Sequence, residues 1–279
     1  MANFTAADVK KLRDATGAGM LDCKKALEES DGDYEGAVDI LRLKGAKDVG
    51  KRASRTASNG LVAAELDGTS AGVLVELNCE TDFVAKTDLF QQVAAEIAAT
   101  ALAQRPADRL VLLGLEARPG VTVQQLIDEA AASLKEKIEL GRYTLLEGGY
   151  VASYLHYSDR SLPPTLGVLV QLDSPAEQAA KDTAQQVAAM RPQYLTREEV
   201  PAEVVDHERS LAEQMARDEG KPEQAIAKIV EGRVGAYFKD MVLIEQPFVR
   251  ENKKTVKQML GEHGVTVQAF ARFKVGEAG

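Results

Sequence analysis

Residues 78–86 read NCETDFVAK. They follow the run GVLVEL at residues 72–77, whose branched apolar residues are typical of a buried strand. They precede residues 88–103, in which apolar residues recur at the spacing of a helix. The sequence therefore predicts that residues 78–86 form the turn between a strand and a helix.

The turn contains a capping residue next to an unusual pair of side chains. Thr81 can cap a short helical segment if its hydroxyl accepts from the backbone N–H of Phe83 or Val84. Such a cap would place Asp82 beside Phe83, an anion next to a large apolar ring. Because aromatic residues are mostly buried, one interpretation is that Phe83 covers the core. The other is that Asp82 and Phe83 face outward and bind a partner.

A second copy of this pattern lies downstream in the same chain. Residues 167–173 read GVLVQLD and repeat the strand, and residues 182–189 repeat the first half of the helix. An earlier strand is also repeated, so the sequence indicates a duplicated β-β-α unit. Gln178 of the second copy stands where the first copy has Phe83. A fold that required a ring here should carry one in both copies, so the comparison favours an outward-facing Asp82 and Phe83.

The patterns along the whole chain predict an α+β protein. A compact three-helix module is expected over residues 1–45, followed by a basic linker over 46–59. Two related core subdomains with antiparallel sheets are expected over residues 60–148 and 149–279. A helical hairpin is inserted in the second subdomain at about 201–238, and it either projects from the body or folds back onto the core.

Three local expectations depend on periodicity alone. Residues 104–118 contain proline and are expected to be irregular, whereas residues 123–140 are expected to form one helix. Residues 241–249 are a strand candidate that Pro247 interrupts.

The composition disfavours several classes of function. The formal net charge of −9 disfavours a nucleic-acid-binding surface, since phosphate contacts need a basic face. Cys23 and Cys79 form no metal-ligand pattern, and no phosphate loop or nucleophile motif is present. We therefore expect no catalytic residue, metal, cofactor or directly bound nucleotide. Without a signal peptide or an apolar run long enough for a membrane, the protein is expected in the cytoplasm.

Two motifs of the chain resemble the signatures of one family. Residues 78–86, together with TGAGMLDCKKAL at residues 16–27, are similar in sequence and order to the signatures of the elongation factor Ts family. The resemblance extends to about Val275. It implies an N-terminal module that folds like a ubiquitin-associated domain, and a hairpin that projects. It also implies a guanine-nucleotide exchange factor of elongation factor Tu that promotes GDP release during translation elongation and is not an enzyme.

The resemblance further implies roles for particular residues. Asp82 and Phe83 would disturb the magnesium site of elongation factor Tu, with Phe83 as an apolar wedge, while Thr81 and Val84 hold the turn. Many members of the family carry histidine where this chain has Gln186. The further residues expected to bind elongation factor Tu, in its GDP-bound and nucleotide-free forms, are Arg13, Met20, Leu21 and Gln186.

A second hypothesis belongs to a different class of protein. The chain could be a binding module without exchange activity, such as a scaffold associated with RNA or the ribosome. Its only support is the excess of basic residues at 44–55, and we favour a solvated linker or an exposed helix as the explanation of that excess. An enzyme is a third hypothesis, and no motif supports it.

Overall fold

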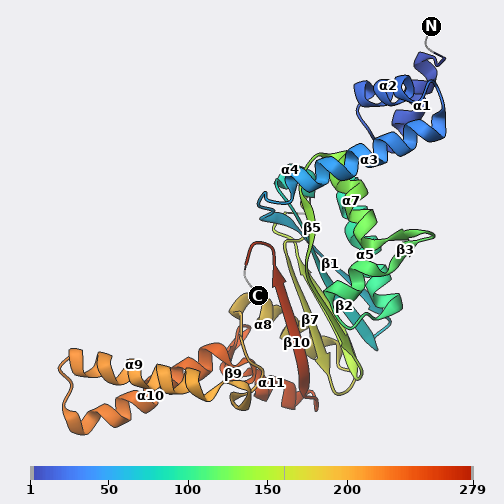
Figure 1. The fold of residues 1–279 in the computed structure, drawn as a ribbon. Helices are drawn as coiled ribbons and strands as arrows, with labels where there is room; N and C mark the ends of the chain where they lie inside the picture. Colours follow the sequence, from blue (N-terminus) through green and yellow to red (C-terminus); the bar gives the residue numbers. More distant parts are fainter. Residues whose placement is uncertain (1–2, 160, 278–279) are drawn as a thin grey trace.

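The structure, a computed structural model, describes residues 3–159 and 161–277, except the side chains of Ala46 and Lys47. It confirms the α+β class, with a three-helix module, two subdomains built on antiparallel three-stranded sheets, and a helical hairpin inserted in the second. The module lies at one end of the molecule and the hairpin projects from the other (Figure 1). Among the described residues, no helix is long and apolar enough to cross a membrane.

Three helices form the N-terminal module: α1 (Ala6–Thr16), α2 (Met20–Glu29) and α3 (Tyr34–Arg52). A capping box begins α1, because Thr5 Oγ1 accepts from the backbone N–H of Asp8 while the Asp8 carboxylate accepts from the backbone N–H of Thr5. The core of the module contains buried residues from all three helices, among them Leu12, Leu27 and Ala37.

The third helix extends beyond the expected module. It continues to Arg52, so the first half of the segment expected as a linker over 46–59 is helical. Its last turns pack against α7 (Val123–Leu134), where Arg52 Nη1 donates to the carbonyl oxygen of Ala131 at 3.2 Å. Packing of this kind stabilises helix that sequence propensity alone would not. The side chain of Lys47, part of the expected basic segment, lies outside the described residues.

The first subdomain is built on the strands β1 (Asn59–Asp67), β2 (Ala71–Cys79) and β5 (Ile138–Glu147), in the order β1-β2-β5. Every residue of the central strand β2 is buried, because helices cover one face of the sheet and the second sheet covers the other. The short helix α4 (Asp82–Ala85) and the long helix α5 (Asp88–Gln104) follow β2.

The stretch expected to be irregular contains regular elements. Helix α6 (Arg109–Gly114) and the small hairpin of β3 (Glu116–Arg118) and β4 (Val121–Thr122) lie between α5 and α7. These elements are too short to give a clear period in the sequence, so periodicity could not identify them.

The helix predicted over residues 123–140 is wrong at its C-terminal end. α7 ends at Leu134, because Lys135 adopts a left-handed backbone with φ of 61° and caps the helix. Ile138 then begins strand β5, which pairs with β2. The apolar spacing continued across this change because Leu134 and Ile138 both face the same core.

The second subdomain repeats the three-stranded sheet. Strands β6 (Tyr150–His156), β7 (Leu166–Leu172) and β10 (Val267–Lys274) are antiparallel and lie in the order β10-β7-β6. Helix α8 (Glu177–Met190) follows β7 as α5 follows β2. β10 is the edge strand of this sheet and pairs with the central strand β7.

The inserted hairpin consists of α9 (Ala202–Asp218) and α10 (Glu223–Met241). The two helices bury their own apolar cluster, separate from the cores of the subdomains. Figure 1 shows that the hairpin projects from the body and does not fold back onto it. The buried residues of this cluster are Ala212, Ala216, Ile226, Val230 and Val234.

The strand predicted over residues 241–249 is mostly wrong. α10 continues to Met241, and only Pro247–Phe248 form a strand, β8, which pairs with β9 (Glu251–Thr255). The reason is the buried side chain of Gln246, whose Nε2 donates to the carbonyl oxygen of Asp240 at 2.7 Å and holds the segment in a turn. The remaining elements are the 3-10 helices Arg197–Glu199 and Leu243–Glu245, and α11 (Val256–Glu262).

The duplication is longer than the sequence comparison indicated. In both subdomains a small two-stranded hairpin precedes a helix, and that helix leads into the third strand of the sheet. Thr122 and Gln125 form the capping box of α7, and Thr255 and Gln258 form the same box at α11. The repeated unit therefore includes two strands, a helix, a hairpin, a capped helix and a third strand.

The two sheets pack face to face through a shared apolar cluster. Side chains from β1 and β2 meet side chains from β6, β7 and β10. This packing joins the two subdomains into one body. The buried residues at the contact are Val62, Leu74, Val151, Leu169 and Phe273.

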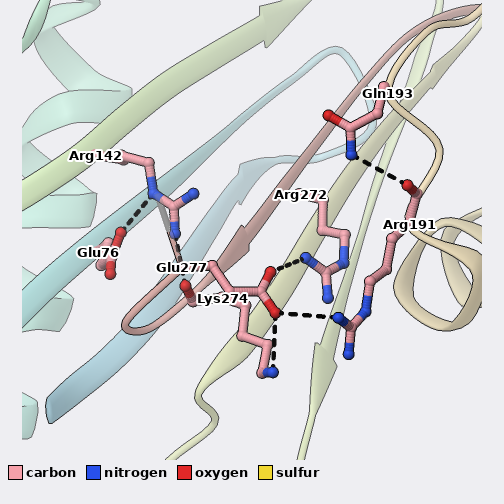
Figure 2. A network of polar contacts seen from close by, with 7 residues as sticks. All are labelled: Glu76, Arg142, Arg191, Gln193, Arg272, Lys274 and Glu277. Atoms are coloured by element: carbon pink, nitrogen blue, oxygen red, sulfur yellow. Dashed lines mark hydrogen bonds and ion pairs between the residues drawn. The ribbon is translucent and has the colours of Figure 1, made fainter. Parts of the chain in front are cut away.

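A polar network lies beside this apolar contact, and one of its hydrogen bonds joins the two sheets (Figure 2). Arg142 of β5 donates to Glu76 Oε2 at 2.6 Å and to the carbonyl oxygen of Lys274 at 2.7 Å. Past the end of β10, the Glu277 carboxylate accepts from Arg272 at 2.7 Å and from Lys274 at 2.9 Å. Hydrogen bonds from these two cations lower the pKa of Glu277 to about 2. The network therefore links the first subdomain to the last strand of the chain.

Candidate functional site

The turn after β2 presents Phe83 to solvent. Thr81 Oγ1 accepts from the backbone N–H of Val84 at 3.3 Å and caps α4, as the sequence predicts. Val84 points into the core of the first subdomain, whereas Phe83 is 78% exposed. The ring that fills this core is Phe90 of α5, which is fully buried. The structure therefore excludes the interpretation of Phe83 as a cover of the core.

Asp82 and Phe83 share a contact with one lysine. Lys86 Nζ lies 2.6 Å from Asp82 Oδ2 and 5.5 Å from the centroid of the Phe83 ring. The hydrogen bond from Lys86 is the main cause of a lowered pKa of Asp82. Asp82 is therefore an anion in the free protein. All three side chains lie at the surface, where an ion pair of this kind contributes little to folding.

The carboxylate of Glu136, which is distant in the sequence, binds the backbone of the turn that carries Phe83. Glu136 lies between α7 and β5, and its Oε2 accepts from the backbone N–H groups of Glu80 and Thr81, each at 3.0 Å. Its Oε1 accepts from Thr81 Oγ1 at 2.6 Å. Sequence reasoning gave Glu136 no role in the turn, since these partners lie 55 residues or more apart and no local pattern connects them.

Glu80 makes the reciprocal contact. Its Oε1 accepts from the backbone N–H of Lys137 at 2.6 Å and from Arg55 Nη1 at 3.1 Å. The hydrogen bond from the Lys137 backbone is the largest cause of a lowered pKa of Glu80. Asn59 Nδ2 also donates to the Glu80 carbonyl oxygen at 2.8 Å. The segment before Asp82 is therefore fixed by contacts to β1, to the residues that follow α3 and to the residues that precede β5.

The chemistry of the turn excludes a reactive cysteine and offers no metal site. Cys79 is buried, its Sγ donates to the carbonyl oxygen of Thr81 at 3.1 Å, and burial raises its pKa to about 12. Within the described part of the chain, no three His, Cys, Asp or Glu residues lie close enough to hold a metal ion. The arrangement is suited to contact with another surface and offers no group placed for covalent chemistry.

A second exposed apolar pair lies at the start of α2. Met20 is 50% exposed and Leu21 is 74% exposed, although they begin a helix whose other face is buried. Arg13 is exposed in the last turn of α1. The three residues therefore belong to the surface of the N-terminal module.

Gln186 is placed differently from the expectation. Its side chain is fully buried, with Nε2 donating to Gln246 Oε1 at 3.0 Å and Oε1 accepting from the backbone N–H of Val249 at 2.9 Å. Gln186 therefore offers no surface in the free protein, and its direct contact with a partner stays a prediction. It positions the turn between β8 and β9, where Val249 is exposed.

Comparison with known proteins gives one result for the whole chain. The family model described as elongation factor TS matches residues 80–277. A protein named elongation factor Ts from Thermobifida fusca is 60% identical over 278 residues, which is 100% of both chains. Proteins of the same name from Acidothermus cellulolyticus and Streptomyces coelicolor are 56% and 54% identical, each over 99% of this chain and 100% of the relative.

Proposed function

This chain belongs to the elongation factor Ts family, and we propose that it is the guanine-nucleotide exchange factor that binds elongation factor Tu and promotes release of GDP during translation elongation. Nucleotide exchange breaks no covalent bond, so the protein needs no catalytic residue and is not an enzyme. A role in translation elongation goes with a cytoplasmic location. The same role requires binding to both the GDP-bound and the nucleotide-free form of elongation factor Tu.

The observation that carries the proposal is the exposed Phe83 on a turn that is held from three sides. A flexible loop would lose conformational entropy on binding, whereas this turn has already been ordered by Glu136, Glu80 and the Thr81 cap. Phe83 is suited to enter an apolar gap, and Asp82 is suited to approach a donor or to repel another anion. Val84 anchors the turn to the core.

The mechanism we propose acts on the magnesium ion that accompanies GDP in the partner. Mg²⁺ tolerates little departure from octahedral geometry, and it neutralises the charge of the phosphates. Insertion of Phe83 and Asp82 beside this ion would distort its surroundings and weaken the binding of GDP to elongation factor Tu. By linkage, bound GDP must lower the affinity of elongation factor Tu for this protein by the same ratio.

The N-terminal module supplies the second contact in this proposal. Met20 and Leu21 would bury apolar surface on the partner, and Arg13 would add a charge at the edge of that contact. The two contact regions come from different parts of the chain, so the turn can act on the magnesium site while the module keeps the partner bound.

The alternative of an RNA-associated scaffold has weaker support. The basic side chains that the structure describes in residues 44–55 already have partners within the protein, so phosphate groups would have to compete with these contacts. These contacts are Lys44 with Asp22, Lys51 with Asp48, Arg52 with the Ala131 carbonyl and Arg55 with Glu80.

A stopped-flow measurement tests the proposal. Elongation factor Tu loaded with fluorescent GDP is mixed with excess unlabelled GDP and increasing amounts of this protein. We expect release to accelerate with the concentration of this protein, and to slow again as free Mg²⁺ is raised. Release that is independent of this protein would reject the exchange function. A salt-sensitive shift of RNA in a gel, without any effect on GDP release, would favour the scaffold.

A further inference from the structure

The seven residues 131–137, which we call the α7–β5 junction, contact the segments that support both exposed surfaces used in the proposed function. On one side, Glu136 and Lys137 bind the backbone and side chains of the turn that carries Phe83. On the other side, the N-terminal module docks on the same segment through Arg52 and Ala131. A single short segment therefore touches the supports of both contact regions.

The loop that leads into Met20 also lies on this junction. A Cβ atom at Gly17 would meet Ser133 Oγ at 2.9 Å, and one at Gly19 would lie 3.7 Å from Lys135 Nζ. The backbone of the loop is therefore in close contact with the end of α7. Gly17 has φ of 66°, a conformation that a residue with a side chain rarely adopts, so glycine suits this close approach.

Glu136 is the residue of the junction that controls the turn most directly. It accepts three hydrogen bonds, two from backbone N–H groups that precede α4 and one from the hydroxyl of Thr81. Hydrogen bonds to a carboxylate are about twice as strong as those between neutral groups. Without Glu136, the backbone N–H groups of Glu80 and Thr81 would lose their partner at a partly buried position.

The bond to the hydroxyl has an additional consequence for the cap of α4. The Thr81 hydroxyl donates its proton to Glu136 and uses an oxygen lone pair to accept from Val84. Glu136 therefore sets the orientation of the hydroxyl that caps α4. Loss of Glu136 would loosen the cap and the position of the next residues, Asp82 and Phe83.

We propose that Glu136 is a positioning residue for nucleotide exchange, which holds the Asp82–Phe83 turn at a fixed place relative to the surface of Met20 and Leu21. This inference rests on the proposed function. Glu136 lies beneath the turn and acts through Thr81. If the turn moved freely relative to the module, Phe83 would occupy the position needed for insertion for only part of the time. The maximal rate of GDP release would then fall.

A double-mutant cycle separates positioning from a general effect on folding. GDP release is measured at saturating factor for wild type, Glu136→Ala, Phe83→Ala and the double variant. We expect Glu136→Ala to slow maximal release about tenfold, and the double variant to match Phe83→Ala within about twofold, since residues that act as a unit are not additive. Glu136→Gln retains an acceptor for the two backbone N–H groups and should fall between wild type and Glu136→Ala.

The matched control is Glu96→Ala. Glu96 of α5 is a carboxylate of the same subdomain that holds Arg118 through two hydrogen bonds, away from the turn. Its loss should leave the maximal rate within about twofold of wild type, as expected for a surface contact. Glu136→Asp keeps the charge but is one methylene shorter, and it replaces Glu136→Ala if that variant does not fold.

A second measurement on the free protein does not depend on exchange activity. Amide hydrogen exchange at Thr81 and Val84 should become about tenfold faster in Glu136→Ala, because local opening of the turn becomes easier. Unchanged amide exchange would overturn the inference. So would normal GDP release by Glu136→Ala while Phe83→Ala is slow, or a double variant whose two effects multiply. A wild-type protein that does not accelerate release would instead overturn the proposed function.

Discussion

Replacement of Phe83 by alanine should affect exchange much more than folding. The side chain is 78% exposed in the free protein, and Lys86 Nζ lies 5.5 Å from its ring centroid. Loss of an exposed ring should change the free energy of unfolding by less than about 1 kcal/mol. By contrast, Phe90→Ala in the core of the same subdomain should cost about 3–5 kcal/mol, since Phe90 is fully buried.

The effect on exchange follows from the surface that Phe83 still has to bury. Full burial of such a side chain is worth roughly 1.5–3 kcal/mol. Because 78% of the residue is exposed before binding, roughly three quarters of this free energy, or about 1–2 kcal/mol, can be gained in the complex. If the gain occurs where the magnesium site is strained, Phe83→Ala should slow GDP release about 5–30-fold.

Two assays decide the prediction. Urea unfolding compares the stability of wild type, Phe83→Ala and Phe90→Ala, and stopped-flow fluorescence follows GDP release from elongation factor Tu. A chelator should narrow the difference in GDP release rate between wild type and Phe83→Ala, because without Mg²⁺ no magnesium site has to be distorted. The reasoning would be refuted if Phe83→Ala lost several kcal/mol of stability, or if the folded variant released GDP at the wild-type rate.

Three further predictions concern other parts of the molecule. Met20→Asp should weaken binding to nucleotide-free elongation factor Tu about tenfold or more in calorimetry, since it removes an apolar contact and adds a charge to be desolvated. The variant should still fold, because an acidic residue is favourable in the first turn of α2. An unchanged affinity would contradict a contact of Met20 with the partner. Lys135→Gly should raise the free energy of unfolding in urea by about 0.5–1 kcal/mol, because glycine has no Cβ atom to clash with the backbone at φ of 61°. A lower urea midpoint for Lys135→Gly would show that the Lys135 side chain makes a contact worth more than this strain. Glu277 has a folded-state pKa of about 2, below the ordinary 4.5, so its stabilisation is present above pH 4.5 and is lost as the pH falls towards 2; the stability difference between wild type and Glu277→Gln should therefore shrink over this interval, and a difference that grows would contradict the assignment.

The sequence by itself determined the features that depend on neighbouring residues. Capping residues act within three or four positions, so the start of α1 and the cap of α4 at Thr81 could be predicted from residue types and spacing. The comparison of the two internal copies also favoured an outward-facing Phe83, and the structure places it in solvent. The roles of Met20, Leu21 and Arg13 in partner binding stay predictions.

Tertiary structure alone decided how the turn is held and where several elements end. Glu136 reaches Thr81 across 55 residues, and the hydrogen bonds of Gln186 and Gln246 cross a similar distance. Local propensity carries no information on such contacts, so the sequence could place Gln186 on a helix without showing that Gln246 and Val249 enclose it. α7 ends at Leu134, where Lys135 caps it and the chain from Ile138 pairs with β2, and α3 continues to Arg52 because it packs on α7. In each case the decisive partner is distant in the chain and becomes a neighbour only in the folded tertiary structure.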